Sequence, residues 1–248
     1  MTAAAPARRR GHQALAHPVA ANAMQALLDL DHGRRPSMLS RWQPVKILWG
    51  LTMESTALRI IREEHFSIAA VLRSLRLMLQ RGPGDDPQPF FDAMRAMLFY
   101  IDEVPEKEHH PKETELLFKP LLARMSEHSQ VLEHLESDHA NGERAVRELQ
   151  HQLLAWELMG EGRREVFAKN LNSYITFYLE HMRLEETVII PAALKVFTTD
   201  DWAAIDAAFA KNRDPLAKGA ELSPEYEQLF HRIVRIAPSP IGLGESEG

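Results

Sequence analysis

Residues 109–113 read His-His-Pro-Lys-Glu and residues 181–185 read His-Met-Arg-Leu-Glu, two copies of His-x-x-x-Glu; the same spacing also occurs from His139 to Glu143. A lone histidine precedes each copy, His65 the first and His139 the second. The gaps are similar, 109 − 65 = 44 and 181 − 139 = 42 residues. A sparse pattern repeated with matched gaps indicates an internal repeat. We therefore expect four helices of similar length, each offering one or two side chains to a shared interior.

The residue types in this repeat suit a metal site. Residues four apart share one face of a helix, so the histidine and the glutamate of each pair point the same way. Such a pair can bind one ion together, and the second carboxylate oxygen can reach a neighbouring ion. Imidazole combined with carboxylate suits iron, manganese or zinc. The predicted metal-binding residues are His65, His109, Glu113, His139, His181 and Glu185.

Each of these residues, taken alone, has an ordinary structural explanation. A lone helical histidine is more often a solvated side chain than a ligand, and Glu113 or Glu185 alone would be a surface acid. Against this, His65 and His181 lie beside apolar positions, where an unpaired polar group costs about 1–3 kcal/mol. The joint pattern therefore favours the metal site.

Other histidines and one tyrosine need separate interpretations. His110 is either an alternative ligand or a residue that supports the ligands. Tyr178 is a core aromatic residue that could also lean towards His181, one turn later. The remaining histidines are expected at the surface or in packing roles: His12, His17, His32, His128, His134, His151 and His231.

A competing pattern, Glu-x-x-His, is typical of ferritin-like di-iron bundles, which use two such motifs and two further glutamates. That hypothesis leaves His65 and His181 without a role, and three occurrences show how common the motif is in this acidic chain. It is the weaker of the two. The occurrences are Glu106 to His109, Glu136 to His139 and Glu148 to His151.

Composition excludes several classes of protein. Of 248 residues, 45% are hydrophobic and 26% are charged, which is ordinary for a globular protein with an ample core. The chain has no cysteine, which excludes disulfides, zinc knuckles, cysteine-ligated iron–sulfur clusters and thiol catalysis. The formal net charge of −6 offers no global attraction to nucleic acid. No run approaches about eighteen apolar residues, so we expect no membrane span and a cytoplasmic protein.

The first 52 residues differ from the rest of the chain. They hold seven Lys/Arg against two Asp/Glu, a local charge of +5. They lack the apolar stretch of a secretory signal, and we expect a basic, poorly ordered extension over 1–52 in which only 20–30 suits a helix. Met53, close to a helix start, suggests that the functional chain begins there. The expected bundle covers 53–197, and a C-terminal helical segment and tail follow over 198–248.

Helical periodicity begins near residue 54. Apolar residues recur at three- and four-residue steps and no useful stretch alternates with period two, so the predicted fold is all-α. Glycine and proline end the first helix at 82–87 and the third at 160–162. Pro105 and Pro111 predict a kink or break of the second helix at 103–110. The expected helices are 54–80, 89–122 with this interruption, 127–159, 163–195, 200–211 and 223–236.

Several segments together resemble a known family. They are Glu64-His65 with Val71-Leu72, residues 109–113 leading into Leu116-Leu117-Phe118, Asp138-His139 with Gly142, and His181 with Glu185 and Pro191. Their arrangement is similar to that of bacterial hemerythrin-like domains of the HHE cation-binding type, over about residues 54–197. The resemblance implies an up-down four-helix bundle around two non-haem iron ions joined by an oxo or hydroxo bridge, held by the six residues named above. Manganese and zinc are less favoured.

The sequence also departs from the oxygen-carrying members of that family. Those use a His-x-x-x-His pair on the third helix, whereas Leu135 stands four residues before His139 here, so one iron loses a nitrogen ligand. Members that repair iron–sulfur clusters resemble this bundle but typically carry an added module that contains cysteine. This chain has no cysteine and therefore no such module. We expect a protein that binds or senses a small ligand such as oxygen, nitric oxide or peroxide. The alternatives are a di-iron enzyme acting on peroxide or nitric oxide and an iron-dependent regulatory module.

Overall fold

A computed structural model of the protein describes residues 55–212, 214–216, 224–238 and 242. These residues are mostly helical and include no strand, which confirms the predicted all-α class. The predicted extension over 1–52, with its helix at 20–30, lies outside the described residues. The helices are α2 (Thr56–Arg81), α3 (Pro87–Glu103), α4 (His110–Glu113), α5 (Lys119–Arg124), α6 (Ser129–Met159), α7 (Arg164–Leu184), α8 (Ile190–Val196), α9 (Thr199–Phe209) and α10 (Pro224–Ile236).

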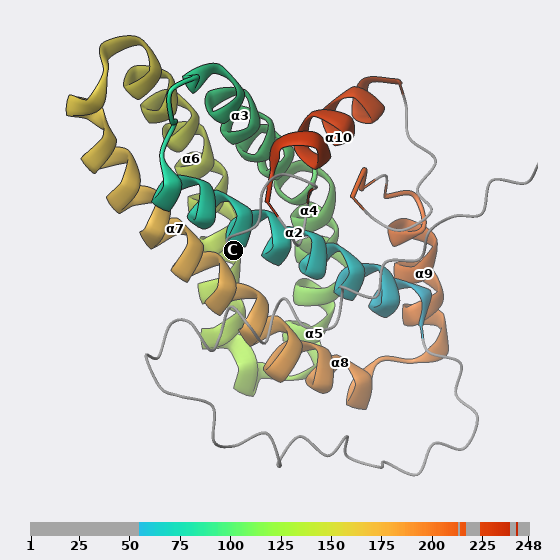
Figure 1. Cartoon of the computed structure of the whole chain (residues 1–248). Coiled ribbons are helices and arrows are strands. Elements are labelled where there is room, and N and C mark those ends of the chain that lie inside the picture. Colours follow the sequence, from blue (N-terminus) through green and yellow to red (C-terminus); the bar gives the residue numbers. More distant parts are fainter. Residues whose placement is uncertain (1–54, 213, 217–223, 239–241, 243–248) are drawn as a thin grey trace, which may run out of the picture.

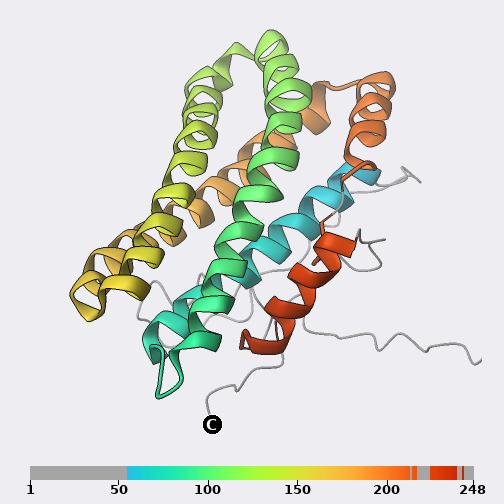
Figure 2. The ribbon, with the colours of Figure 1, turned by 90° about the horizontal axis from the view of Figure 1, so that it is seen from above.

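Four long helical segments of the described chain form an up-down bundle. The segments are α2, the run from α3 to α5, α6, and the run from α7 to α8, and Figure 1 and Figure 2 show them alternating in direction. Helix α6 packs against α3 and α7, and α2 packs against the same two helices, which closes the ring. The two later helices lie on the outside of this ring, α9 against α2 and α10 against α3.

The interruption expected at 103–110, a kink or a break, is present as a turn residue and a π-helical turn, and the chain does not break out of the helix there. The chain stays helical from Pro87 to Arg124 except at one turn residue, Val104, and it contains two π-helical turns, η2 (Pro105–His109) and η3 (Thr114–Phe118). A third, η6 (Glu185–Ile189), joins α7 to α8.

Proline explains where these turns lie. A proline lacks an N–H group, and its ring clashes with the carbonyl four residues earlier. The residue before Pro111 donates its N–H to the carbonyl five residues back, and the same holds for the residues before Pro120 and Pro191. The extra residue in each turn lets the helix continue past the proline. Such turns often occur at functional sites, and here each adjoins a residue of the repeat.

Glycine ends two of the long helices at the predicted places. Helix α2 stops at Gly82, with φ 75°, and α6 stops at Gly160, with φ 85°. A residue with a side chain rarely adopts this left-handed conformation, whereas glycine adopts it readily. Helix α9 starts with a capping box in which Thr198 and Asp201 bind each other's backbone N–H groups.

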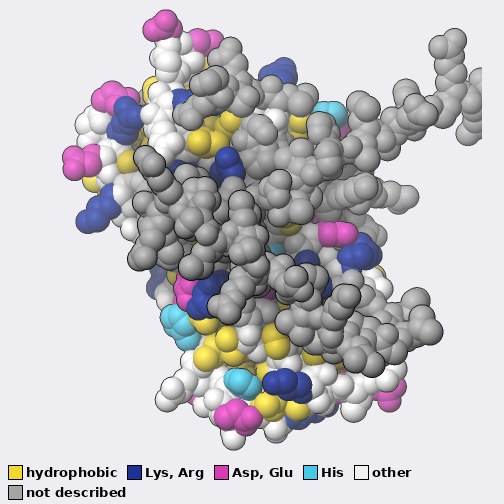
Figure 3. All heavy atoms as spheres, turned by 60° about the horizontal axis from the view of Figure 1, so that its bottom comes forward, with side chains coloured by type: hydrophobic (Ala, Val, Ile, Leu, Met, Phe, Trp, Pro, Cys, Tyr) yellow, Lys and Arg dark blue, Asp and Glu magenta, His cyan; other side chains and the backbone are white. Residues whose placement is uncertain are grey.

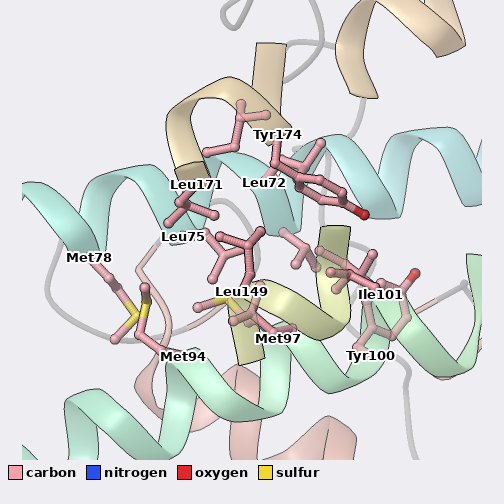
Figure 4. Close-up of a cluster of buried hydrophobic side chains, with 14 of the residues drawn as sticks. Leu72, Leu75, Met78, Met94, Met97, Tyr100, Ile101, Leu149, Leu171 and Tyr174 are labelled. Carbon is pink, nitrogen blue, oxygen red and sulfur yellow. The ribbon is translucent and has the colours of Figure 1, made fainter. Parts of the chain in front are cut away.

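The apolar core is split into two clusters. The larger one joins α2, α3, α6, α7 and α10, and Figure 4 shows its leucine and methionine side chains meeting from several helices. The smaller one joins the start of α2, α5, the start of α6, α8 and α9. The residues of the repeat lie at or near the boundary between the two clusters in each long segment, for example His65 between Ile61 and Ile68 in α2. A polar layer therefore crosses the middle of the bundle.

Among the described residues, no helix is long and apolar enough to cross a membrane. On the coloured part of the face in Figure 3, acidic and basic side chains are interspersed, and hydrophobic side chains gather towards the lower end of the view.

Candidate metal centre

The polar layer contains all six residues that the sequence predicted as metal ligands. His65 comes from α2, His139 from α6 and His181 from α7, while the other three belong to the helical runs through η2, α4 and η6. The side chain of His139 is 9% exposed, and those of the other five are at most 2% exposed. Every long segment of the bundle therefore contributes at least one of these side chains to a single buried cluster.

The two His-x-x-x-Glu pairs have the geometry expected of residues on one helix face. His109 Nε2 lies 3.1 Å from Glu113 Oε1, and His181 Nε2 lies 3.1 Å from Glu185 Oε1. The other oxygen of each glutamate faces a lone histidine. Glu113 Oε2 is 3.8 Å from His139 Nε2, and Glu185 Oε2 is 3.3 Å from His65 Nε2. Both carboxylates thus lie between imidazoles of different helices.

The donor atoms gather in two groups. One group consists of His65, His109 and Glu113, and in it one donor atom of each residue lies within 4.8 Å of the others. The second group meets the same criterion and consists of His110, Glu113, His139 and His181. Glu113 belongs to both groups, as a carboxylate that bridges two ions would.

Several buried polar atoms in this cluster have no hydrogen-bond partner. An unpartnered buried donor or acceptor costs about 1–3 kcal/mol, more when it is charged. A cation at each group would satisfy these atoms, and imidazole with carboxylate is a donor set for iron, manganese or zinc. The unpartnered atoms are Nε2 of His65 and His109 and both carboxylate oxygens of Glu113 and Glu185.

Protons take the place of a cation in the metal-free fold. Burial lowers the pKa of His65, but the nearby carboxylates of Glu185 and Glu186 outweigh it and raise that pKa to about 9. Burial also lowers the pKa of His181, yet Glu185 and Asp138 raise it to about 10. In turn, although burial raises the pKa of Glu185, His181 and its neighbours hold it well below its usual value. A metal ion entering the cluster therefore displaces protons.

The second ring nitrogen of each histidine in the cluster lies within hydrogen-bonding distance of a side-chain oxygen. Such partners fix the tautomer and the ring orientation of metal-binding histidines. Since every Nδ1 is engaged in this way, the Nε2 atoms are left to face the interior. The pairs are His65 with Glu186 at 3.0 Å, His109 with Glu64 at 2.6 Å, His110 with Glu106 at 2.9 Å, His139 with Thr114 at 2.9 Å and His181 with Asp138 at 3.4 Å.

The sequence analysis did not assign these supporting partners. Glu64 and Asp138 each precede a lone histidine, but each one orients the histidine of the following segment and not its own neighbour. The repeat itself carried this signal, because 138 − 64 = 74 equals the offset between the lone histidines, 139 − 65 = 74. The contact across helices could not be read from adjacency in the chain.

The segment after α9 closes one side of the cluster. The ring of Phe209, which is fully buried, meets His109 edge-on at 5.7 Å between centroids. Asn212 donates from Nδ2 to both oxygens of Glu64, at 2.9 and 3.1 Å, and Glu64 in turn holds His109. Residues outside the repeat thus position one of its histidines.

Asp214 lies in the same segment, and its negative charge is unfavourable because the side chain is buried. It is 3% exposed, and burial, assisted by the negative charge of Glu64, raises its pKa to about 7. A carboxyl whose pKa is higher in the fold than in the unfolded chain binds protons more tightly when folded, so stability falls as pH rises from about 4 to about 7.

We therefore expect Asp214→Asn to raise the free energy of unfolding of the metal-free protein, and the increase should be roughly 2–3 kcal/mol larger at pH 8 than at pH 5. The figure follows from about 1.4 kcal/mol per unit of pKa shift. Urea unfolding at the two pH values measures this difference. Asp85→Asn, a change at an exposed residue between α2 and α3, is the control and should show no such dependence. An equal gain at both pH values would contradict the charge argument.

The ferritin-like alternative is not supported by the positions of its residues. The carboxylate of Glu106 contacts His110 and the hydroxyl of Tyr174, and Glu106 belongs to neither donor group. Glu136, Glu148 and His151 are exposed on α6. As suggested by its place one turn before His181, Tyr178 does lean towards the cluster, where its hydroxyl lies 3.0 Å from His110 Nε2.

Comparison with known proteins agrees with this geometry. A family model described as "Hemerythrin HHE cation binding domain" matches residues 56–193. The matched stretch runs from α2 into α8 and contains the whole cluster. No curated protein matches the chain.

Proposed function

Because the chain belongs to the hemerythrin HHE cation-binding family, we propose that it is a non-haem di-iron protein that binds or senses a small ligand such as oxygen, nitric oxide or peroxide. The observation that carries this proposal is the set of buried, unpartnered imidazole and carboxylate atoms, arranged as two groups that share Glu113. Each of the two groups would hold one ion.

The residues of the cluster have distinct tasks in this proposal. His65 and His109 would hold one iron ion, and His139 and His181 the other, while Glu113 and Glu185 would each offer one oxygen to either side. Bound iron supplies reversible redox chemistry and coordination of small molecules, which these side chains lack. The oxygens beside Nδ1 would keep the imidazoles aimed inward.

Burial favours a small ligand over a large substrate. The six proposed ligand side chains are at most 9% exposed, and Phe209 and Asn212 cover the side of His109. A diatomic molecule or peroxide fits such a site, and we rank binding or sensing above the alternative of an enzyme that turns over peroxide or nitric oxide. Assays of turnover with both compounds separate the two hypotheses.

The proposal predicts about two iron ions per chain after expression in iron-replete medium. The six ligand side chains would fill much of the coordination of two ions and leave room for solvent and one small ligand. The measurement is elemental analysis together with an optical spectrum of protein purified under air and under nitrogen. We expect near-ultraviolet absorption that changes between the two preparations. Protein that retains no transition metal would refute the proposal.

A further inference from the structure

The internal repeat relates the two halves of the cluster residue by residue, and it fails at one place. His65 corresponds to His139, His109 to His181 and Glu113 to Glu185. With the same offset of 72 residues as the last two pairs, His110 corresponds to Met182, since 110 + 72 = 182. One half of the bundle therefore offers an additional imidazole that the other half lacks.

His110 is built into the cluster in the same way as the proposed ligands. It is 5% exposed, and one of its nitrogens lies within 4.8 Å of donor atoms of Glu113, His139 and His181. Its ring stacks on that of His139, with centroids 4.1 Å apart and an angle of 9° between the planes. This contact places the ring of His110 inside the cluster, directly against that of a proposed ligand.

The support behind His110 also matches that of the other four histidines. Its Nδ1 lies 2.9 Å from Glu106 Oε2, and Glu106 is buried among helices α3, α6 and α7 through contacts with Tyr174 and Gly142. A Cβ atom at residue 142 would lie 2.9 Å from Glu106 Oε1, so the glycine makes room for this carboxylate. The chain thus provides a dedicated place for the partner of His110.

We propose that His110 is a further metal-binding residue, which completes a position of three imidazoles with His139 and His181 and leaves the other position with His65 and His109. This inference rests on the proposed function. The sequence analysis expected one iron to lose a nitrogen ligand because Leu135 stands in place of a histidine on the third helix; under this proposal, His110 would supply that nitrogen from the neighbouring segment.

Unequal donor sets give the two positions different metal preferences. Imidazole favours later divalent metals such as cobalt and zinc more than carboxylate does. The position of His110, His139 and His181 should therefore take up Co²⁺ or Zn²⁺ first and more tightly, and the position of His65 and His109 should fill second.

One contact competes with this assignment. The hydroxyl of Tyr178 lies 3.0 Å from His110 Nε2, so the alternative role of His110 is to hold this tyrosine without binding metal. Two variants distinguish these roles. His110→Met installs the residue of the corresponding position in the other half, whereas Tyr178→Phe removes only the hydroxyl and leaves the imidazole in place.

The test is calorimetric titration of the metal-free proteins with Co²⁺ and with Zn²⁺. The wild type should bind two ions in two resolved steps. His110→Met should weaken the tighter step at least tenfold and leave the weaker step unchanged, while Tyr178→Phe should keep both steps. His151→Met, a change at an exposed histidine of α6, is the matched control and should behave as the wild type.

Each other outcome decides against the inference. Unchanged titration of His110→Met, or equal weakening by His110→Met and Tyr178→Phe, would show that His110 is not a donor. A wild type that binds no metal would instead refute the proposed function. A crystal structure of the zinc-loaded wild type tests the same point without a variant, since a bound imidazole nitrogen lies about 2.0–2.1 Å from zinc.

Discussion

Glu113→Gln should abolish binding of both metal ions, because Glu113 is the one residue that belongs to both donor groups. Its two oxygens face His109 on one side and His139 on the other, and its side chain is fully buried. Glutamine keeps the volume but removes the negative charge and one acceptor oxygen, so both positions lose a ligand at once and only the carboxylate of Glu185 remains between them. We expect metal occupancy to fall from about two ions to near zero.

Single changes at the histidines should have a narrower effect. His109→Ala and His181→Ala each remove one imidazole and leave a neighbouring carboxylate without its cation, which costs several kcal/mol in a buried site. Each should lose mainly the ion of its own group. Elemental analysis after identical purification compares these variants.

His151→Ala and His231→Ala serve as controls for the same measurement, since both histidines are exposed. They should load as the wild type does. If Glu113→Gln and the controls carried equal amounts of metal, the assignment of the six ligands would be wrong. Circular dichroism of each variant distinguishes loss of metal from loss of fold.

Metal loading should raise the melting temperature at pH 8 by an amount on the order of 10 °C. A ligand bound only by the folded state adds about 4 kcal/mol at a thousandfold excess over Kd, and each kcal/mol shifts the melting temperature by roughly 2–4 °C for a protein of this size. The buried, unpartnered oxygens of Glu113 and Glu185 gain their partners only when the metal is present.

The effect of pH on this stabilisation follows from the histidines. The pKa of His65, about 9, and that of His181, about 10, lie above the usual 6.5 in the metal-free fold. Raised histidine pKa values stabilise the metal-free fold at low pH, and this contribution is lost as pH rises through 9 to 10. Because the metal must displace these protons, its affinity falls by about tenfold per pH unit for each proton displaced.

The increase in melting temperature should therefore be much smaller at pH 5.5 than at pH 8. Thermal melts by circular dichroism with and without iron, at both pH values, measure the difference. An ordinary histidine would compete with the metal for protons only up to about pH 6.5. Because the pKa values of His65 and His181 are raised, this competition extends to higher pH. Coincident melts at pH 8, in protein that demonstrably contains iron, would mean that the metal is peripheral.

Much of the fold followed from local patterns in the sequence. Apolar residues at helical spacing placed the helices, and the backbone freedom of Gly82 and Gly160 placed two of their ends. The positions of the proposed ligands followed from the repeat, because one turn of helix puts His109 beside Glu113 and His181 beside Glu185 whatever the rest of the chain does.

The π-helical turns were not predicted, because proline removes a backbone bond but does not by itself say whether the helix ends or widens. In the structure the helix widens at this place and continues. The continuous helix matters for the site, because it carries His109 directly on from α3.

Tertiary structure alone decided which side chains lie behind the proposed ligands and where His110 lies among them. Glu64 orients His109 and Asp138 orients His181 across helices, and Asn212 reaches Glu64 from 148 residues away in the chain. A helical period fixes which residues share a face, because it depends only on the backbone of one segment. Which faces meet depends on how four segments pack around one polar layer, and no single segment contains that information.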